Sequence, residues 1–263
     1  GGCMKPTGWA LTDVGRRRDH NEDSYLCNND IGLFAVADGM GGHLGGERAS
    51  RMAVEILDRE MSRGVTLSTL DTELIQKGGK APPPSPAAVT AALKQSVAEA
   101  TRSIYDMAQH TPELAGMGTT LTGAYFHGDR VTFCHVGDSR AYLYRNGQAR
   151  QLTEDHSWIQ EQVRAGLLAP DDVLATRFRN IITRSVGFEP TVEPDVVSLP
   201  LEAGDCFLIC SDGLSNYLTS DDIGRVLTDE FYRDAPRALV ELANERGGED
   251  NVTCVVVYVS NQE

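Results

Sequence analysis

Residues 32–46 read Gly-Leu-Phe-Ala-Val-Ala-Asp-Gly-Met-Gly-Gly-His-Leu-Gly-Gly, and Asp38 lies at the centre of this stretch. Residues 33–37 are an apolar run of strand length, and the glycines that follow cannot continue a strand. We therefore expect Asp38 at the end of a strand, facing an open turn. Two interpretations of this turn are open. Asp-Gly is ordinary turn sequence, but the same residues also let a carboxylate and a backbone carbonyl approach a metal ion closely.

Three more aspartates occur in a similar setting, next to glycine or a small polar residue. Asp138 lies in a turn between two predicted strands, Asp212 follows the apolar strand 206–210, and Asp250 stands at the entrance of strand 252–259. Four carboxylates at sheet ends would repel one another unless a cation lies between them. An all-oxygen set of this kind selects hard cations such as Mg²⁺ or Mn²⁺ over zinc. Two such ions that share a carboxylate can activate water and hold a phosphoryl group.

The composition is that of a soluble globular protein, and it restricts the partners. The chain has 263 residues, with 41% hydrophobic and 24% charged residues, which suits one large domain or two small ones. A formal net charge of −14, from 24 basic and 38 acidic residues, argues against nucleic acid as a partner. No run approaches the roughly 20 apolar residues of a membrane helix. We therefore expect no membrane span within this segment.

The six cysteines do not form a zinc or redox motif, because no CxxC and no nearby Cys/His pair occurs. Cys206 and Cys210 fall in one predicted strand, where their Cα atoms would be about 13 Å apart, too far for a disulfide. We therefore expect reduced thiols and a cytoplasmic domain.

Periodicity predicts the secondary structure. Apolar positions at helical spacing predict helices at residues 47–61, 87–107, 157–165, 220–227 and 236–245. Apolar runs between turn signals predict strands at residues 8–12, 33–37, 119–126, 130–136, 141–144, 206–210 and 252–259. Short turns join the three strands between residues 119 and 144. These strands are therefore expected to pair antiparallel with one another in sequence order.

Two segments interrupt this pattern. Residues 77–86 are rich in Pro and Gly and are expected to form a surface loop between two helices. Residues 154–187 are a mostly polar excursion between strand regions. We interpret this excursion as a flap over a site.

A charged run near the N-terminus, residues 16–23, reads Arg-Arg-Arg-Asp-His-Asn-Glu-Asp. Such a run is usually a solvated loop. Alternatively, its arginines hold an anion beside a cation site. The choice depends on where the fold places the run.

At six places the sequence resembles the metal-dependent serine/threonine protein phosphatases of the 2C type (PPM family), in their bacterial branch. Each motif alone is weak, but six in the family's order, spread over nearly the whole chain with compatible spacing, are specific. The motifs are Arg-Asp-His-Asn-Glu-Asp at 18–23, Ala-Val-Ala-Asp-Gly-Met-Gly-Gly-His at 35–43, Gly-Thr-Thr-Leu-Thr at 118–122, Gly-Asp-Ser-Arg at 137–140, Ser-Asp-Gly-Leu at 211–214 and Asp-Asn-Val-Thr at 250–253.

The resemblance implies an α+β fold, a four-layer αββα sandwich of two antiparallel sheets flanked by helices, with a dimetal site in a cleft at one end. Residues 1–263 would form a single catalytic domain. By motif match, Asp38 would bridge two Mn²⁺ or Mg²⁺ ions, Asp212 and Asp250 would complete the first, and the Gly39 carbonyl would serve the second. Asp138 matches the aspartate that binds a third, weaker ion in bacterial members.

The resemblance also implies the residues that act on the substrate. Glu22 and Asp23 would orient waters at the ions, and Arg18 would hold the substrate phosphate. The chemistry of the side chain agrees, because the planar guanidinium stays charged and fits phosphate oxygens with two parallel hydrogen bonds. A water activated by two cations needs no protein nucleophile, so the absence of an evident Ser/His/Asp set is expected.

The sequence departs from the family pattern at two positions. Eukaryotic relatives carry a His, a proposed general acid, where this chain has Met40, as bacterial members commonly do. His43 is a candidate acid nearby, although a glycine-flanked His is more often a loop-packing residue. Asn216 stands where many members have an acidic residue, a change that is expected to weaken or reshape the outer metal coordination.

The leading hypothesis is hydrolysis of phosphoserine and phosphothreonine on proteins, in opposition to a bacterial Ser/Thr kinase, by a monomeric enzyme. Two alternatives remain open. One is a phosphoesterase that acts on small molecules, and the other is a pseudophosphatase that serves only as an interaction module. The intact set of metal-binding positions argues against the pseudophosphatase.

Overall fold

The structure is a computed structural model that describes residues 3–69 and 82–262. Its strands form two antiparallel sheets. The first sheet has the strand order β1 (Cys3–Asp13), β11 (Val252–Gln262), β10 (Cys206–Cys210), β7 (Arg140–Arg145) and β8 (Gln148–Gln151). The second has the order β2 (Asp23–Asn28), β3 (Leu33–Met40), β5 (Leu121–His127), β6 (Arg130–Val136) and β9 (Asp195–Pro200), and β4 (Gly118–Thr119) pairs with β3.

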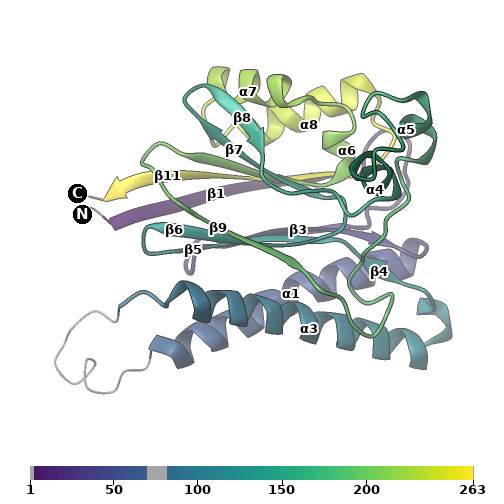
Figure 1. The fold of residues 1–263 in the computed structure, drawn as a ribbon, viewed down its shortest axis with the longest axis horizontal. Helices are drawn as coiled ribbons and strands as arrows, with labels where there is room; N and C mark the ends of the chain where they lie inside the picture. Colours follow the sequence, from purple (N-terminus) through teal and green to yellow (C-terminus); the bar gives the residue numbers. More distant parts are fainter. Residues whose placement is uncertain (1–2, 70–81, 263) are drawn as a thin grey trace.

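Helices cover the outer face of each sheet, so the molecule has four layers (Figure 1). Two long helices, α1 (His43–Thr69) and α3 (Pro86–His110), pack on the second sheet, whereas α7 (Ser220–Asp229) and α8 (Ala235–Arg246) pack on the first. The short elements are η1 (Pro112–Leu114), α4 (Trp158–Arg164), α5 (Val173–Phe178) and α6 (Asp212–Ser215). The predicted αββα sandwich is thus confirmed.

Strand β10 shows why the sequence forms this sandwich. Its five residues are all buried, because alternate side chains enter different cores. Leu208 and Cys210 pack with the helices α7 and α8, whereas Phe207 and Ile209 pack between the two sheets. A continuous apolar run therefore marks a strand that is covered on both faces. Strand β11 follows the same rule, with Val256 in the outer core and Val255 between the sheets.

The expected pairing of three consecutive strands is wrong at one step. Strands β5 and β6 do pair antiparallel, but β7 lies in the other sheet, between β10 and β8. The turn at Gly137 therefore crosses from one sheet to the other, and β6 pairs instead with β9. A short turn permits either outcome, and the pairing depends on partners far along the chain. The predicted strand 119–126 is also divided into β4 and β5 at Thr120, whose N–H donates to the Asp38 carbonyl (2.9 Å).

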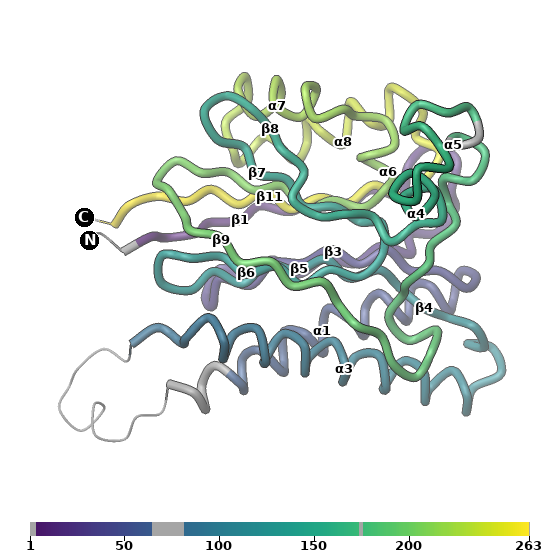
Figure 2. Tube along the Cα trace, in the orientation of Figure 1, coloured from purple at the N-terminus to yellow at the C-terminus, as the bar shows by residue number. Residues whose placement is uncertain are grey.

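The two irregular segments have different outcomes. Residues 154–187 leave the sandwich after β8, form α4 and α5 at one end, and return toward β9 (Figure 2). Of the expected surface loop 77–86, residues 77–81 lie outside the described residues. Residues 82–85 are irregular, and the Ser85 side chain caps α3 by accepting from Ala88 N–H (3.2 Å).

The chemical expectations for thiols and membrane spans can also be compared with the structure. Cys206 and Cys210 are both free, as predicted, and so are Cys27, Cys134 and Cys254. Within residues 3–69 and 82–262, no helix has the length and apolar character required to span a bilayer.

Candidate active site

The fold brings three of the predicted aspartates together at one end of the sandwich. Asp38 lies near the end of β3, Asp212 opens α6 directly after β10, and Asp250 precedes β11. One carboxylate oxygen from each lies within 4.8 Å of the other two. Asp38 is more than 170 residues away from the other two aspartates in the sequence. The fold thus brings distant segments into one acidic cluster.

The main chain of Asp38 is fixed by the Gly-Thr-Thr motif. Thr120 Oγ1 accepts a hydrogen bond from Asp38 N–H (2.9 Å) and contacts Ser139 Oγ (2.7 Å). Burial, followed by the charges of Asp23 and Asp212, raises the pKa of Asp38 well above its ordinary value. The fold therefore holds a carboxylate rigidly in a place where its charged form is unfavourable unless a cation is bound.

Asp23 lies on β2 directly opposite Asp38. Its Oδ2 accepts hydrogen bonds from Ser211 Oγ (2.9 Å) and Thr253 Oγ1 (2.6 Å). Burial nevertheless raises the pKa of Asp23 to about 7, because desolvation outweighs these two bonds. Protonation of Asp23 is therefore more favourable than that of an ordinary aspartate when no cation compensates its charge.

Several carboxylate oxygens at this end are buried without a hydrogen-bond partner among the described residues, namely Glu22 Oε1, Asp23 Oδ1, Asp138 Oδ1 and Asp212 Oδ1. An unsatisfied buried polar atom costs about 1–3 kcal/mol, and more when it is charged. The shared remedy is a cation, and an all-oxygen donor set suits Mn²⁺ or Mg²⁺. The residues present thus fit a divalent metal centre.

The glycines around Asp38 are required by close backbone approach. Gly39 N–H donates to the Glu22 carbonyl (3.0 Å), and a Cβ on Gly39 would lie 1.9 Å from Gly46 O. A Cβ on Gly46 would lie 2.0 Å from Glu22 Oε1. The glycine-rich turn therefore allows Glu22 to pack against the start of α1, beside the acidic cluster.

Asp138 lies next to the cluster but outside the group of three carboxylates. It is buried, and burial followed by the charges of Asp212 and Asp155 raises its pKa well above the ordinary value. Together with Asp212 and Asn216 it lines a cavity of about 290 Å³ whose other wall comes from the flap, including Gln160 of α4. The flap therefore covers the side of the site where Asp138 lies.

Arg18 contacts the cluster from its outer side. Its Nη2 lies 3.4 Å from Asp250 Oδ1, and 48% of its side chain is exposed. Asn251 holds the loop that carries Arg18, because its Oδ1 accepts from Glu22 N–H and its Nδ2 donates to the carbonyls of Val14 and His20, each at 2.9 Å. The charged run 16–23 is thus a loop that is fixed at the site, rather than a solvated segment alone.

Comparison with known proteins decides the family. The sequence profile of the Protein phosphatase 2C family matches residues 15–252. The chain is 34% identical over 250 residues to the serine/threonine phosphatase Stp of Listeria monocytogenes, covering 94% of this chain and 93% of that protein.

The chain belongs to the protein phosphatase 2C family.

Solved structures agree with this family. The serine/threonine phosphatase of S. agalactiae superposes with a TM-score of 0.80 at 37% identity, over 97% of this chain and 99% of that one. The catalytic domain of the phosphatase PstP, in complex with two manganese ions, superposes with a TM-score of 0.81 at 33% identity, over 98% and 100%. The predicted family, fold and enzyme class, a metal-dependent protein serine/threonine phosphatase, are confirmed.

Four residues that support the site of this phosphatase received no role in the sequence analysis. They are Thr120, Ser211, Asn251 and Thr253, which position Asp38, Asp23 and the Arg18 loop. The sequence did indicate these positions, because each of the four residues lies in a motif that carries the family resemblance. Their roles were not evident, since a threonine or asparagine beside an aspartate is also ordinary turn sequence.

The candidate general acid of this phosphatase stays a prediction. His43 is the first residue of α1, and its ring lies 4.5 Å from the ring of His20, centroid to centroid. Both rings are exposed, so solvent can reach them.

Proposed function

We propose that this phosphatase hydrolyses phosphoserine and phosphothreonine on proteins at a centre of two Mn²⁺ or Mg²⁺ ions. In this proposal Asp38 would be shared by the two ions, Asp212 and Asp250 would complete the ligands of the first, and the Gly39 carbonyl would serve the second. The observation that carries it is the convergence of three partly buried carboxylates, with one oxygen of each within 4.8 Å of the others. When bound, the ions supply Lewis-acid activation of water and of the phosphoryl group.

The chain's own residues supply the positioning. Glu22 and Asp23 lie beside the cluster, each with an oxygen free of protein hydrogen bonds in the described structure, which supports a role in orienting water. Arg18 lies on the open side next to Asp250, where its half-exposed guanidinium can bind phosphate oxygens. In this role Arg18 would hold the substrate phosphate.

Arg18→Ala is expected to reduce kcat/KM by about 10- to 150-fold, the loss of a charge-assisted hydrogen bond worth roughly 1.5–3 kcal/mol. Metal affinity should change little, because Arg18 is not a ligand. Steady-state kinetics on a phosphopeptide, combined with Mn²⁺ titration, measure both quantities. Arg16→Ala and Arg17→Ala are the matched controls. Loss of activity in a control with Arg18→Ala unaffected would show that the register of this motif is wrong.

Asp138 is assigned to a third, weaker cation. Its burial, its raised pKa and its oxygen without a hydrogen-bond partner among the described residues support this assignment. We further propose that residues 1–263 form one catalytic domain with a flap at residues 154–187. The unbroken family match over residues 15–252 supports this organisation.

The substrates are phosphoproteins, and we propose that a Ser/Thr kinase of the same cell supplies them and that the enzyme is a monomer. The free thiols at five described positions support a reducing, cytoplasmic compartment. In an assay with Mn²⁺, phosphopeptides are expected to give a higher kcat/KM than p-nitrophenyl phosphate. The opposite order would favour a small-molecule phosphoesterase, and no turnover of either would favour a pseudophosphatase.

A further inference from the structure

His156, at the start of the flap, contacts both backbone groups of Gly137, the residue before Asp138. The His156 N–H donates to the Gly137 carbonyl (2.8 Å), and Gly137 N–H donates to His156 Nδ1 (3.0 Å). Only 5% of His156 is exposed. Gly137 has φ 107°, and a Cβ there would lie 2.6 Å from Thr120 Cγ2. The turn that presents Asp138 is therefore held between His156 on one side and Thr120 on the other.

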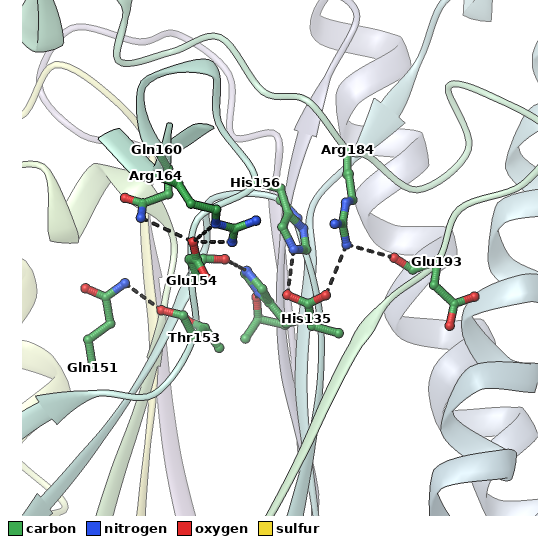
Figure 3. A network of polar contacts seen from close by, with 12 residues as sticks. His135, Gln151, Thr153, Glu154, His156, Gln160, Arg164, Arg184 and Glu193 are labelled. Carbon is green, nitrogen blue, oxygen red and sulfur yellow. Dashed lines mark hydrogen bonds and ion pairs between the residues drawn. The ribbon is translucent and has the colours of Figure 1, made fainter. Parts of the chain in front are cut away.

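The second nitrogen of the His156 ring anchors it to the core. Because a backbone N–H can only donate, Nδ1 must carry the lone pair and Nε2 must carry the proton. Nε2 donates to Asp195 Oδ2 (2.8 Å), and Arg184 Nη1 donates to the other oxygen of the same carboxylate (3.0 Å). Figure 3 shows the side chains of His156 and Arg184 near each other, each with a dashed hydrogen bond. Both ends of the flap thus bind Asp195, the first residue of β9.

A second histidine holds the residue that organises α4. His135 packs its ring against His156, with 4.8 Å between centroids, and its Nε2 donates to the Glu154 carbonyl (2.8 Å). The Glu154 carboxylate in turn accepts from Gln160 (3.2 Å) and Arg164 Nε (3.0 Å) of α4 (Figure 3). The helix of the flap is therefore connected by hydrogen bonds to β6 in the core.

We propose that His156 is a positioning residue that docks the flap onto the core and fixes the Gly137–Asp138 turn. One ring performs both tasks, since Nδ1 holds the turn and Nε2 holds the Asp195 anchor. The part that concerns cation binding rests on the proposed third-ion role of Asp138. Docking of the flap does not depend on that role. Because the two tasks use different nitrogens, they can be separated by substitution.

Three variants separate them. His156→Ala removes both hydrogen bonds of the ring, the one at Nδ1 and the one at Nε2. His156→Asn places an oxygen near the position of Nδ1 and so keeps an acceptor for Gly137 N–H. Asp195→Asn weakens only the anchor. His127→Ala is the matched control, because His127, the last residue of β5, is also buried and bonds to Thr132 on β6. Asp138→Ala tests the third ion itself.

Two measurements that do not require catalysis report the result. The chain has two tryptophans, and Trp158 of α4 packs on Phe178 of α5 (5.3 Å between centroids). Trp158 is half-buried and lies two residues after His156, so in a Trp9→Phe background acrylamide quenching of Trp158 in the metal-free protein is the readout chosen for flap docking. Calorimetric Mn²⁺ titration reports the number and affinity of the ions. The two readouts correspond to the two tasks of His156.

His156→Ala is expected to increase the quenching constant at least twofold and to weaken the weakest Mn²⁺ site about tenfold, the loss expected for one hydrogen bond. His156→Asn and Asp195→Asn should increase quenching but leave Mn²⁺ affinity within about twofold. His127→Ala should change neither. Unchanged quenching in all three flap variants would overturn the proposal. If His156→Ala does not fold, unchanged quenching in His156→Asn and Asp195→Asn would overturn it equally. If Asp138→Ala leaves the isotherm unchanged while flap quenching responds, only the third-ion assignment fails.

Discussion

Asp38→Asn is expected to abolish turnover and, in the metal-free protein at pH 8, to increase the free energy of unfolding. Activity is lost because the substitution removes the anionic ligand proposed to bridge both ions. Stability rises because the pKa of Asp38 is raised well above its ordinary value, chiefly by burial. A carboxyl group of this kind favours the folded state at low pH and loses that contribution as the pH rises through its folded pKa. A neutral amide avoids this loss, and we expect a gain of about 1–2 kcal/mol.

Asp205→Asn is the matched control, because it changes another buried aspartate that already has a partner. Arg145 binds both oxygens of Asp205 at 2.7 and 2.8 Å. Neutralising the buried carboxylate of this ion pair leaves partly exposed Arg145 without its charged partner, so this variant should unfold more easily and keep its activity per folded molecule. Thermal and urea unfolding without metal, followed by phosphopeptide kinetics with Mn²⁺, give both quantities. Destabilisation of metal-free Asp38→Asn would contradict the view that this carboxylate is strained without a cation.

The sequence could predict where the carboxylates of the site lie, but not which residues hold them. A carboxylate at the end of an apolar run is visible in one short window, as Asp38 after residues 33–37 and Asp212 after β10 illustrate. The apolar runs of β10 and β11 are equally local. The strands that end in aspartates, and the sandwich implied by the family motifs, could therefore be found without coordinates.

The partners of these carboxylates could not be found in that way. Asn251 holds a loop 229 to 237 residues earlier in the chain, and Thr253 reaches Asp23 across 230 residues. Such bonds depend on which strands become neighbours, and the transfer of β7 to the other sheet shows that a short turn does not decide this. His156 illustrates the same limit, since its two anchors lie on β9 and in the turn after β6.

Binding of Mn²⁺ at pH 7 is expected to release protons, and Mn²⁺ affinity should increase from pH 6.5 to pH 8. Asp23 has a pKa of about 7 in the metal-free protein, and the pKa of Asp38 is also raised. A nearby divalent cation favours the ionised form of both groups, so they lose protons when the ion binds. For each proton released, the Mn²⁺ affinity increases by up to about tenfold for every unit by which the pH rises. Calorimetry in buffers with different ionisation enthalpies counts these protons directly.

Two buried histidines limit the pH range of this measurement, because their pKa values are shifted in the opposite direction from those of the carboxylates. Burial lowers the pKa of His135 to about 4 from its ordinary 6.5, and it also lowers the pKa of His156. These neutral histidines stabilise the fold above pH 6.5, and their contribution is lost as the pH falls below it. Between pH 6.5 and 8 these two histidines therefore stay mostly neutral. Asp23→Asn keeps an acceptor for Ser211 and Thr253, and it should bind Mn²⁺ with fewer protons released and a weaker dependence on pH. An unchanged proton count in this variant would show that Asp23 is already ionised before the metal binds.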